Sequence, residues 1–256
     1  FTDIFLNFLQ DPEISKAGME AGRQYRAYID GLVQEIKAER AAGVPEKDDM
    51  IGRLISLQQS PASYMTDDRI RDNLIGMVTG ILENTNTAVC NVINWLFDHP
   101  EQLAGAQAAA PAGGDGVRVA YVLEVMRLDT AAPILVRMAT RDHVLGKGTP
   151  FETTIKANSV VFASNGSAMM DETVVEEPEE FRLGRPMHNY LHWGWGLHEC
   201  FGKYISMVQI PEIVKAVLQL ENLRRAPGEE GKLQYHGPFP QSFVVEFEAG
   251  KAVAAG

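Results

Sequence analysis

A cysteine lies within a stretch rich in glycine and aromatic residues, W-G-W-G-L-H-E-C-F-G, at residues 193–202. This cysteine, Cys200, directly precedes a predicted helix at residues 203–220. A thiolate at a helix start is stabilised by unpaired backbone N–H groups and by the positive end of the helix dipole. The glycines remove side chains, so that a flat ligand can approach the backbone closely. The pattern therefore indicates a thiolate held against a planar cofactor.

Other kinds of cysteine site fit this stretch less well. No C-x-x-C pattern accompanies Cys200, as a structural zinc site would require. The six histidines supply no obvious base for a cysteine hydrolase. A lone cysteine near a helix start is more often a small buried hydrophobe, but that interpretation does not explain the glycines.

The elements that must position the stretch are mostly helical. Apolar residues at helical spacing, with capping residues before them and Gly or Pro after them, predict helices at residues 12–41, 50–57, 67–98 and 117–128. The glycine-rich residues 111–116 are expected to be a flexible connection. Short β-prone runs occur at 153–155 and 160–162, and the tail segments K-L-Q-Y and S-F-V-V-E-F-E predict a hairpin or edge strands.

The helix predicted at 67–98 is apolar along both halves but carries E-N-T-N-T at its centre, residues 83–87. A polar run is costly inside a buried helix unless its side chains find partners. Either the run forms a solvated stripe or it lines a site. We favour the second interpretation.

Composition limits the classes of protein. The chain has 256 residues, of which 45% are hydrophobic, and a net charge of −11. Nucleic acid and anionic membrane surfaces are therefore not expected as partners. Only two cysteines and no apolar run of membrane-spanning length predict a reducing, cytoplasmic location without a membrane span. The chain begins at Phe1 rather than Met, as a piece of a longer polypeptide would.

Residues 193–202 resemble the haem-binding loop of the cytochrome P-450 family, aromatic-G-x-G-x-H-x-C-x-G. Three more motifs follow the family's order: D-H-P-E-Q-L at 98–103, E-V-M-R at 124–127 and F-R-L-G-R at 181–185. The resemblance implies a mainly α fold with small β-sheets, lacking the family's N-terminal part. It makes residues 1–256 a single, partial haem domain. Either the chain is a piece of a longer polypeptide, or the missing part is supplied in another way.

The resemblance also implies roles for individual residues. Haem b would be bound with Cys200 as the axial thiolate, while Arg137 and His198 face the propionates. The i,i+3 spacing of Glu124 and Arg127 places both on one helix face, as an ion pair requires. The loop positions around the haem would be Trp193, Gly194, Gly196 and Gly202. The third member of a buried charge cluster, with Glu124 and Arg127, would be Arg185.

The long helix departs from the family at its centre. Monooxygenases of the family usually carry A-G-x-acid-Thr there, in which the acid and the alcohol relay protons. Counting back from Pro100 aligns Glu83 with the acid and Asn84 with the alcohol. A slip of one residue places Glu83 at the alcohol instead. Neither alignment keeps the usual pair, so Glu83, Asn84 and the neighbouring Thr85 are the candidate catalytic residues.

The expected function is therefore that of a haem-thiolate oxidoreductase acting on a hydrophobic small molecule. A weakened proton relay favours an oxidant with a preformed O–O bond, hydrogen peroxide or an organic hydroperoxide. The first alternative is a monooxygenase that uses dioxygen and an electron-donor protein, with water or Thr85 delivering protons. Glu199 stands where many relatives carry a basic residue, which makes docking of an acidic donor less favourable. The second alternative is a non-catalytic haem-binding or structural remnant.

Overall fold

The computed structural model describes residues 11–60, 63–110 and 115–248, with side chains from residue 119 onward in the last range. The chain divides into two compact units. One contains the residues up to Asn84 together with Gly237–Phe239, and the other contains Thr85–His236 and the residues from Pro240. The boundary falls within the long helix α4, Asp67–Asp98, which occupies the residues where the sequence predicts it.

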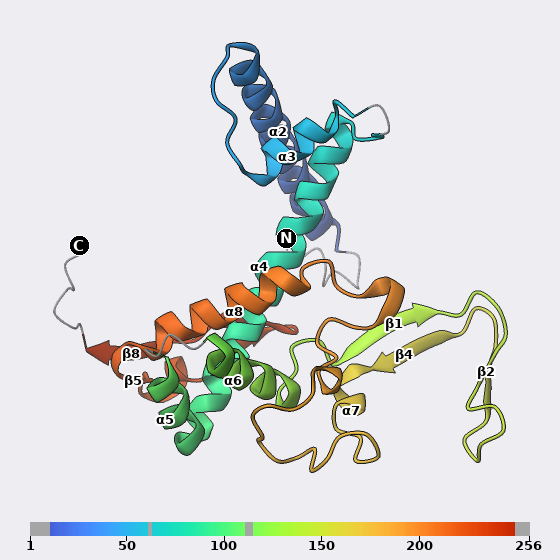
Figure 1. Cartoon of the computed structure of the whole chain (residues 1–256), viewed down its shortest axis with the longest axis vertical. Helices are drawn as coiled ribbons and strands as arrows, with labels where there is room; N and C mark the ends of the chain where they lie inside the picture. Colours follow the sequence, from blue (N-terminus) through green and yellow to red (C-terminus); the bar gives the residue numbers. More distant parts are fainter. Residues whose placement is uncertain (1–10, 61–62, 111–114, 249–256) are drawn as a thin grey trace. The chain divides into compact units, whose positions relative to one another are not determined.

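The first unit is helical. Helix α2 covers Pro12–Ala41 and α3 covers Met50–Leu57, which confirms both predictions (Figure 1). The Asp11 carboxylate accepts from Glu13 N, and the Asp49 carboxylate accepts from Gly52 N, so acidic N-caps begin both helices. Five buried aliphatic side chains join α2, α3 and the first part of α4: Ile29, Val33, Ile55, Ile70 and Leu74.

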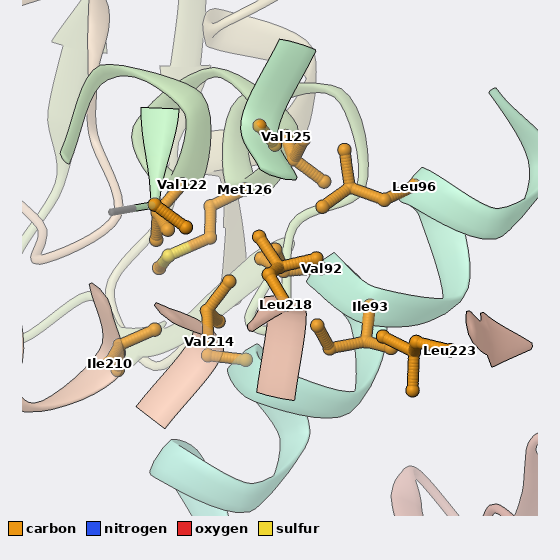
Figure 2. Packing of buried hydrophobic residues seen from close by; sticks show 13 residues of the cluster. Val92, Ile93, Leu96, Val122, Val125, Met126, Ile210, Val214, Leu218 and Leu223 are labelled. Carbon is orange, nitrogen blue, oxygen red and sulfur yellow. The ribbon is translucent and has the colours of Figure 1, made fainter. Parts of the chain in front are cut away.

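The second unit is built around three helices. The second part of α4 packs with α6, Asp115–Leu128, and α8, Lys203–Leu218, while α5, Pro100–Ala109, lies beside them. Figure 2 shows side chains of these helices and of strand β5, Glu221–Arg225, meeting in one cluster: Val92, Ile93, Leu96, Val122, Val125, Met126, Ile210, Val214, Leu218 and Leu223. Residues 121–127 of α6 are apolar apart from two charged positions, and such a helix must be buried on most sides.

The strands of this unit form two-stranded sheets. Strand β1, Ile134–Met138, pairs antiparallel with β4, Val160–Ser164, so that Arg137 lies opposite Val161 (Figure 1). Strand β2, His143–Leu145, pairs with β3, Thr153–Ile155. The β-prone runs predicted at 153–155 and 160–162 are therefore strands.

The tail differs in part from its prediction. The two predicted segments do not form a hairpin with each other. Strand β6, Gln234–His236, pairs with β7, Phe239–Ser242, while β8, Val245–Glu248, pairs antiparallel with β5, Glu221–Arg225. Local β-propensity identifies strands, but the choice of partner depends on tertiary packing.

The remaining elements are short. Helix α7 covers Asn165–Ala168, and single 3₁₀ turns cover Met187–Asn189 (η1), Gly196–His198 (η2) and Gly228–Gly231 (η3). The connection predicted at 111–116 lies largely outside the described residues, and α6 already begins at Asp115. None of the helices in the described ranges combines the length and the apolar character of a membrane span.

Candidate active site

The loop that carries Cys200 folds back on itself before α8. Cys200 N donates to Trp193 O across 2.7 Å, and Lys203 N donates to Cys200 O across 3.2 Å. Gly194 and Gly196 adopt φ values of +72° and +73°, in the left-handed region that favours glycine. These turns leave Cys200 exposed just before the first residue of α8.

Trp193 anchors the loop to the interior of the unit. Its side chain is only 9% exposed and packs in a cluster with Leu123 and Tyr190. The indole Nε1 donates to Ser206 Oγ across 2.7 Å, which joins the loop to the first turn of α8. The Lys203 ammonium lies 5.9 Å from the centre of the indole ring.

Strand β1 lies beside this loop. A Cβ atom placed on Gly194 would lie 3.7 Å from Leu135 Cδ1, so Gly194 and β1 approach closely. Arg137 on β1 and His198 in η2 are both exposed. The second unit thus holds Cys200, Arg137 and His198, but no direct contact joins the Arg137 and His198 side chains in the described structure. Their positions relative to a haem stay a prediction.

The surroundings of Cys200 fit the planar cofactor that the sequence predicts. Leu197 is 95% exposed and Phe201 is 86% exposed, although both are large apolar residues, three positions before the cysteine and one position after it. Further exposed apolar side chains lie on the neighbouring strand β1: Ile134, Val136 and Met138. Large apolar groups beside an exposed thiol are suited to a flat, mainly apolar ligand. The donor set, one thiol with an arginine and a histidine in the same unit, is of the kind that a haem with two carboxylates requires.

The predicted charge cluster is present and buried. Glu124 and Arg127 side chains are 0% exposed, and their ion pair spans 2.8 Å between Glu124 Oε1 and Arg127 Nη2. Arg185 Nε donates to the same carboxylate oxygen across 2.9 Å. Burial alone would raise the pKa of Glu124, but hydrogen bonds from Arg127, from the Arg182 backbone and from Arg185 outweigh it and lower this pKa.

Two further donors to Glu124 were missed by sequence reasoning. Arg182 N donates to Oε1 across 3.1 Å, and the Tyr190 hydroxyl donates to Oε2 across 3.1 Å. Burial and the Glu124 carboxylate raise the pKa of Tyr190, so its hydroxyl stays protonated as a donor. A tyrosine ten residues before the cysteine carries no local signal of this contact.

The two buried guanidinium groups also bind the backbone of the preceding loop. Arg127 Nη1 donates to Met169 O across 3.0 Å and to Pro178 O across 2.6 Å. Arg185 Nη2 donates to Glu177 O and Glu180 O, both across 2.8 Å. The cluster thus ties the segment between α7 and the Cys200 loop to α6. These hydrogen bonds satisfy the buried carbonyl oxygens and, at the same time, the N–H groups of the two buried guanidinium groups.

His192 is a partly buried titratable residue that the sequence did not single out. Its Nε2 lies 3.1 Å from Leu123 O, and its Nδ1 is buried without a partner in the described structure. Nε2 must then carry the hydrogen, because a carbonyl oxygen can only accept. Burial lowers the pKa of His192 to about 4. The ring stacks on Tyr190 and packs edge-on against Trp193.

Several polar side chains at and after the centre of α4 form hydrogen bonds within the protein. Asn84, in the first unit, donates from Nδ2 to Gly80 O across 2.8 Å. Asn86, in the second, donates to Pro240 O across 3.0 Å, and Asn91 accepts from the Tyr235 hydroxyl across 3.1 Å. Two of the helix's polar side chains therefore bind the β6 and β7 segment. The closeness of Glu83, Asn84 and Thr85 to Cys200 stays a prediction.

Comparison with known proteins gives the family. Residues 119–248, about half of the chain, match the family model described as Cytochrome P-450. The chain therefore belongs to the cytochrome P-450 family, as its motifs predict. Its fold resembles the crystal structure of CalO2, with a TM-score of 0.76 at 20% identity, over 93% of this chain and 56% of that chain. This confirms the mainly α fold with small sheets. Family membership implies a haem cofactor.

Three curated relatives show how much of a longer protein the chain matches. Cytochrome P-450 137 of Mycobacterium tuberculosis is 30% identical over 75% of this chain and 41% of its own length. Psi-producing oxygenase A of Emericella nidulans is 36% identical over 47% of this chain and 11% of its own length. A bifunctional dioxygenase–epoxy alcohol synthase of Fusarium oxysporum is 24% identical over 96% of this chain and 20% of its own length. The chain thus spans less than half of each of these three relatives.

Proposed function

We propose that this chain forms the haem-binding part of a haem-thiolate oxidoreductase, with Cys200 as the axial ligand of haem b. The observation that carries the proposal is the exposed Cys200 thiol at the start of α8, beside large apolar side chains that stay uncovered. Arg137 and His198, both exposed, would bind the propionates. Gly194, Gly196 and Gly202 would let the haem approach the loop backbone.

The charge cluster would set the position of this loop. Glu124 joins Arg127 on α6 to Arg185 and Tyr190, which precede the loop in the chain. Because all of these groups are buried and hydrogen bonded, the segment leading to Cys200 has little freedom to move. When bound, thiolate-ligated haem supplies the chemistry that cleaves O–O bonds.

For the oxidant we propose a hydroperoxide of a hydrophobic substrate. One support is the names of two relatives, an oxygenase and a dioxygenase–epoxy alcohol synthase. An epoxy alcohol contains the same atoms as an unsaturated hydroperoxide, so conversion of one into the other breaks the O–O bond without external electrons. The other support is Asn84, whose amide can donate a hydrogen bond to a peroxide oxygen but cannot relay protons as an acid–alcohol pair does.

A reductase-dependent monooxygenase is the second candidate. It is favoured by Glu83, which keeps the acid of the family's usual pair. Thr85 or water would then deliver protons. The Glu199 carboxylate is paired with Lys203 Nζ across 2.7 Å, so its negative charge repels an acidic donor less than the sequence suggests.

The haem spectrum tests the proposal. We expect the reduced chain under carbon monoxide to show the red-shifted Soret band of thiolate-ligated haem, and Cys200→Ser to lose it. A Cys200→Ser variant that kept this band would contradict the assignment of the ligand. A wild-type chain that bound no haem would favour a structural remnant.

Turnover then separates the two catalytic candidates. We expect product from a fatty-acid hydroperoxide alone, without a reductase. Activity only with dioxygen and a reductase system would favour the monooxygenase instead.

A further inference from the structure

Trp193 and Ser206 connect the two ends of the segment that contains Cys200. The indole Nε1 donates to Ser206 Oγ across 2.7 Å, and Ser206 Oγ in turn lies 2.9 Å from Lys203 O, to which it donates. The Ser206 hydroxyl therefore both accepts from the loop and donates within α8. The hydroxyl uses its single hydrogen for the bond to Lys203 O and a lone pair for the bond from the indole.

The backbone of Trp193 holds Cys200 directly. Cys200 N donates to Trp193 O across 2.7 Å, so the position of Trp193 constrains the backbone of the cysteine. The Trp193 side chain is 9% exposed, within the cluster that contains Leu123 and Tyr190. One residue thus joins α6, the Cys200 backbone and the first turn of α8.

The indole N–H is the polar group on which this connection depends. A buried N–H without an acceptor costs more than a hydrogen bond gains, because its desolvation is then uncompensated. Lys203, whose ammonium lies over the ring, cannot accept, because an ammonium has only donors. Ser206 is the acceptor that the structure provides.

We propose that Ser206 is a positioning residue that holds the Cys200 thiolate in place for haem ligation, acting through Trp193. The inference rests on the proposed function, because it requires Cys200 to be the axial ligand. It assigns a role to a residue of α8 that does not belong to the glycine-rich loop. The effect on Cys200 passes through two hydrogen bonds, one from the Trp193 indole N–H to Ser206 Oγ and one from Cys200 N to the Trp193 carbonyl oxygen.

A double-mutant cycle on Trp193 and Ser206 tests the role. The measurement is the rate at which the carbon monoxide complex of the haem-loaded chain loses its thiolate Soret band in mild denaturant. We expect Ser206→Ala to lose the band about ten-fold faster, equivalent to about 1.4 kcal/mol and to one buried hydrogen bond. Alanine is a better helix former than serine, so weakening of α8 itself would not explain the loss.

Trp193→Phe keeps a ring but removes the N–H, and should lose the band at a similar rate. Adding Ser206→Ala to Trp193→Phe should change nothing further, since the shared hydrogen bond is already absent. Ser206→Thr, which keeps the hydroxyl, should restore the wild-type rate.

Three results would contradict the inference. Ser206→Ala at the wild-type rate would show that the hydrogen bond does not hold the ligand. Additive effects of Ser206→Ala and Trp193→Phe would show that Ser206 acts through Lys203 O alone. Failure of Ser206→Thr to restore the rate would show that the hydroxyl is not the required group. If wild type itself shows no thiolate band, the proposed function fails, and this inference fails with it.

Discussion

The Tyr190 hydroxyl donates to Glu124 Oε2 across 3.1 Å, although 66 positions separate the two residues in the sequence. The Glu124 carboxylate also accepts hydrogen bonds from Arg127, from Arg185 and from the backbone N–H of Arg182. The helix α6 and the segment just before the Cys200 loop are joined through one buried side chain.

Removal of this carboxylate should be strongly destabilising. Glu124→Ala leaves two buried guanidinium groups without their shared partner, and we expect a loss of about 3–5 kcal/mol in the free energy of unfolding. Denaturant unfolding and haem content measure the effect. Glu212→Ala is the matched control, because Glu212 forms an i,i+3 pair with Lys215 that is half exposed and should contribute at most about 1 kcal/mol. Equal losses in the two variants would show that the buried pair is no stronger than a surface pair.

Removal of the Tyr190 hydroxyl should have a smaller effect. Tyr190→Phe keeps the ring packed but deletes one hydrogen bond to a charged acceptor, which corresponds to about 1.5–3 kcal/mol. Urea unfolding measures the loss, and Tyr64→Phe at a 75% exposed position should change nothing. If Tyr190→Phe unfolded at the wild-type midpoint, the hydroxyl would have no role in holding the loop.

His192 should make the stability of the protein depend on pH. Its pKa is lowered to about 4 in the folded state by burial, against an ordinary value of about 6.5. The unfolded state therefore binds the proton first, and stability that is present above about pH 6.5 is lost as the pH falls towards about 4. The full loss amounts to about 3 kcal/mol.

The measurement is the free energy of unfolding at several pH values between 7 and 5, above the range of ordinary carboxylates. His192→Phe keeps the stacked ring and should flatten this dependence, while His188→Gln, at an exposed position, should leave it unchanged. An identical slope in wild type and His192→Phe would mean that His192 is not buried as a neutral ring.

Asn84 is the residue on which the choice of chemistry depends. If its amide donates to a hydroperoxide oxygen in the transition state, Asn84→Ala should lower turnover by about 10²–10³-fold. Asn84→Thr restores the family's alcohol beside Glu83, and should shift activity towards dioxygen with a reductase. The three proteins are compared with a fatty-acid hydroperoxide alone and with the reductase system. If activity were the same in wild type and in both Asn84 variants, this result would favour the alternative alignment, in which Glu83 takes the alcohol position.

Some features of this protein could be predicted from the sequence because they are local. The bounds of α2, α3 and α4 follow from apolar spacing, capping residues and proline, all of which act within a few positions. The Cys200 loop is recognisable for the same reason, since its glycines and its cysteine are neighbours in the chain. The pairing of Glu124 with Arg127 follows from their i,i+3 spacing.

Tertiary structure decided the contacts between distant segments. Nothing near Tyr190, His192 or Ser206 in the sequence indicates a bond to Glu124, Leu123 or Trp193. The sequence likewise did not determine which strands pair in the tail, because the β-propensity of a strand is the same for any partner. These contacts arise from burial: once α6 is enclosed, most polar groups beside it must find an acceptor or a donor, and only the packed fold determines which one is within reach.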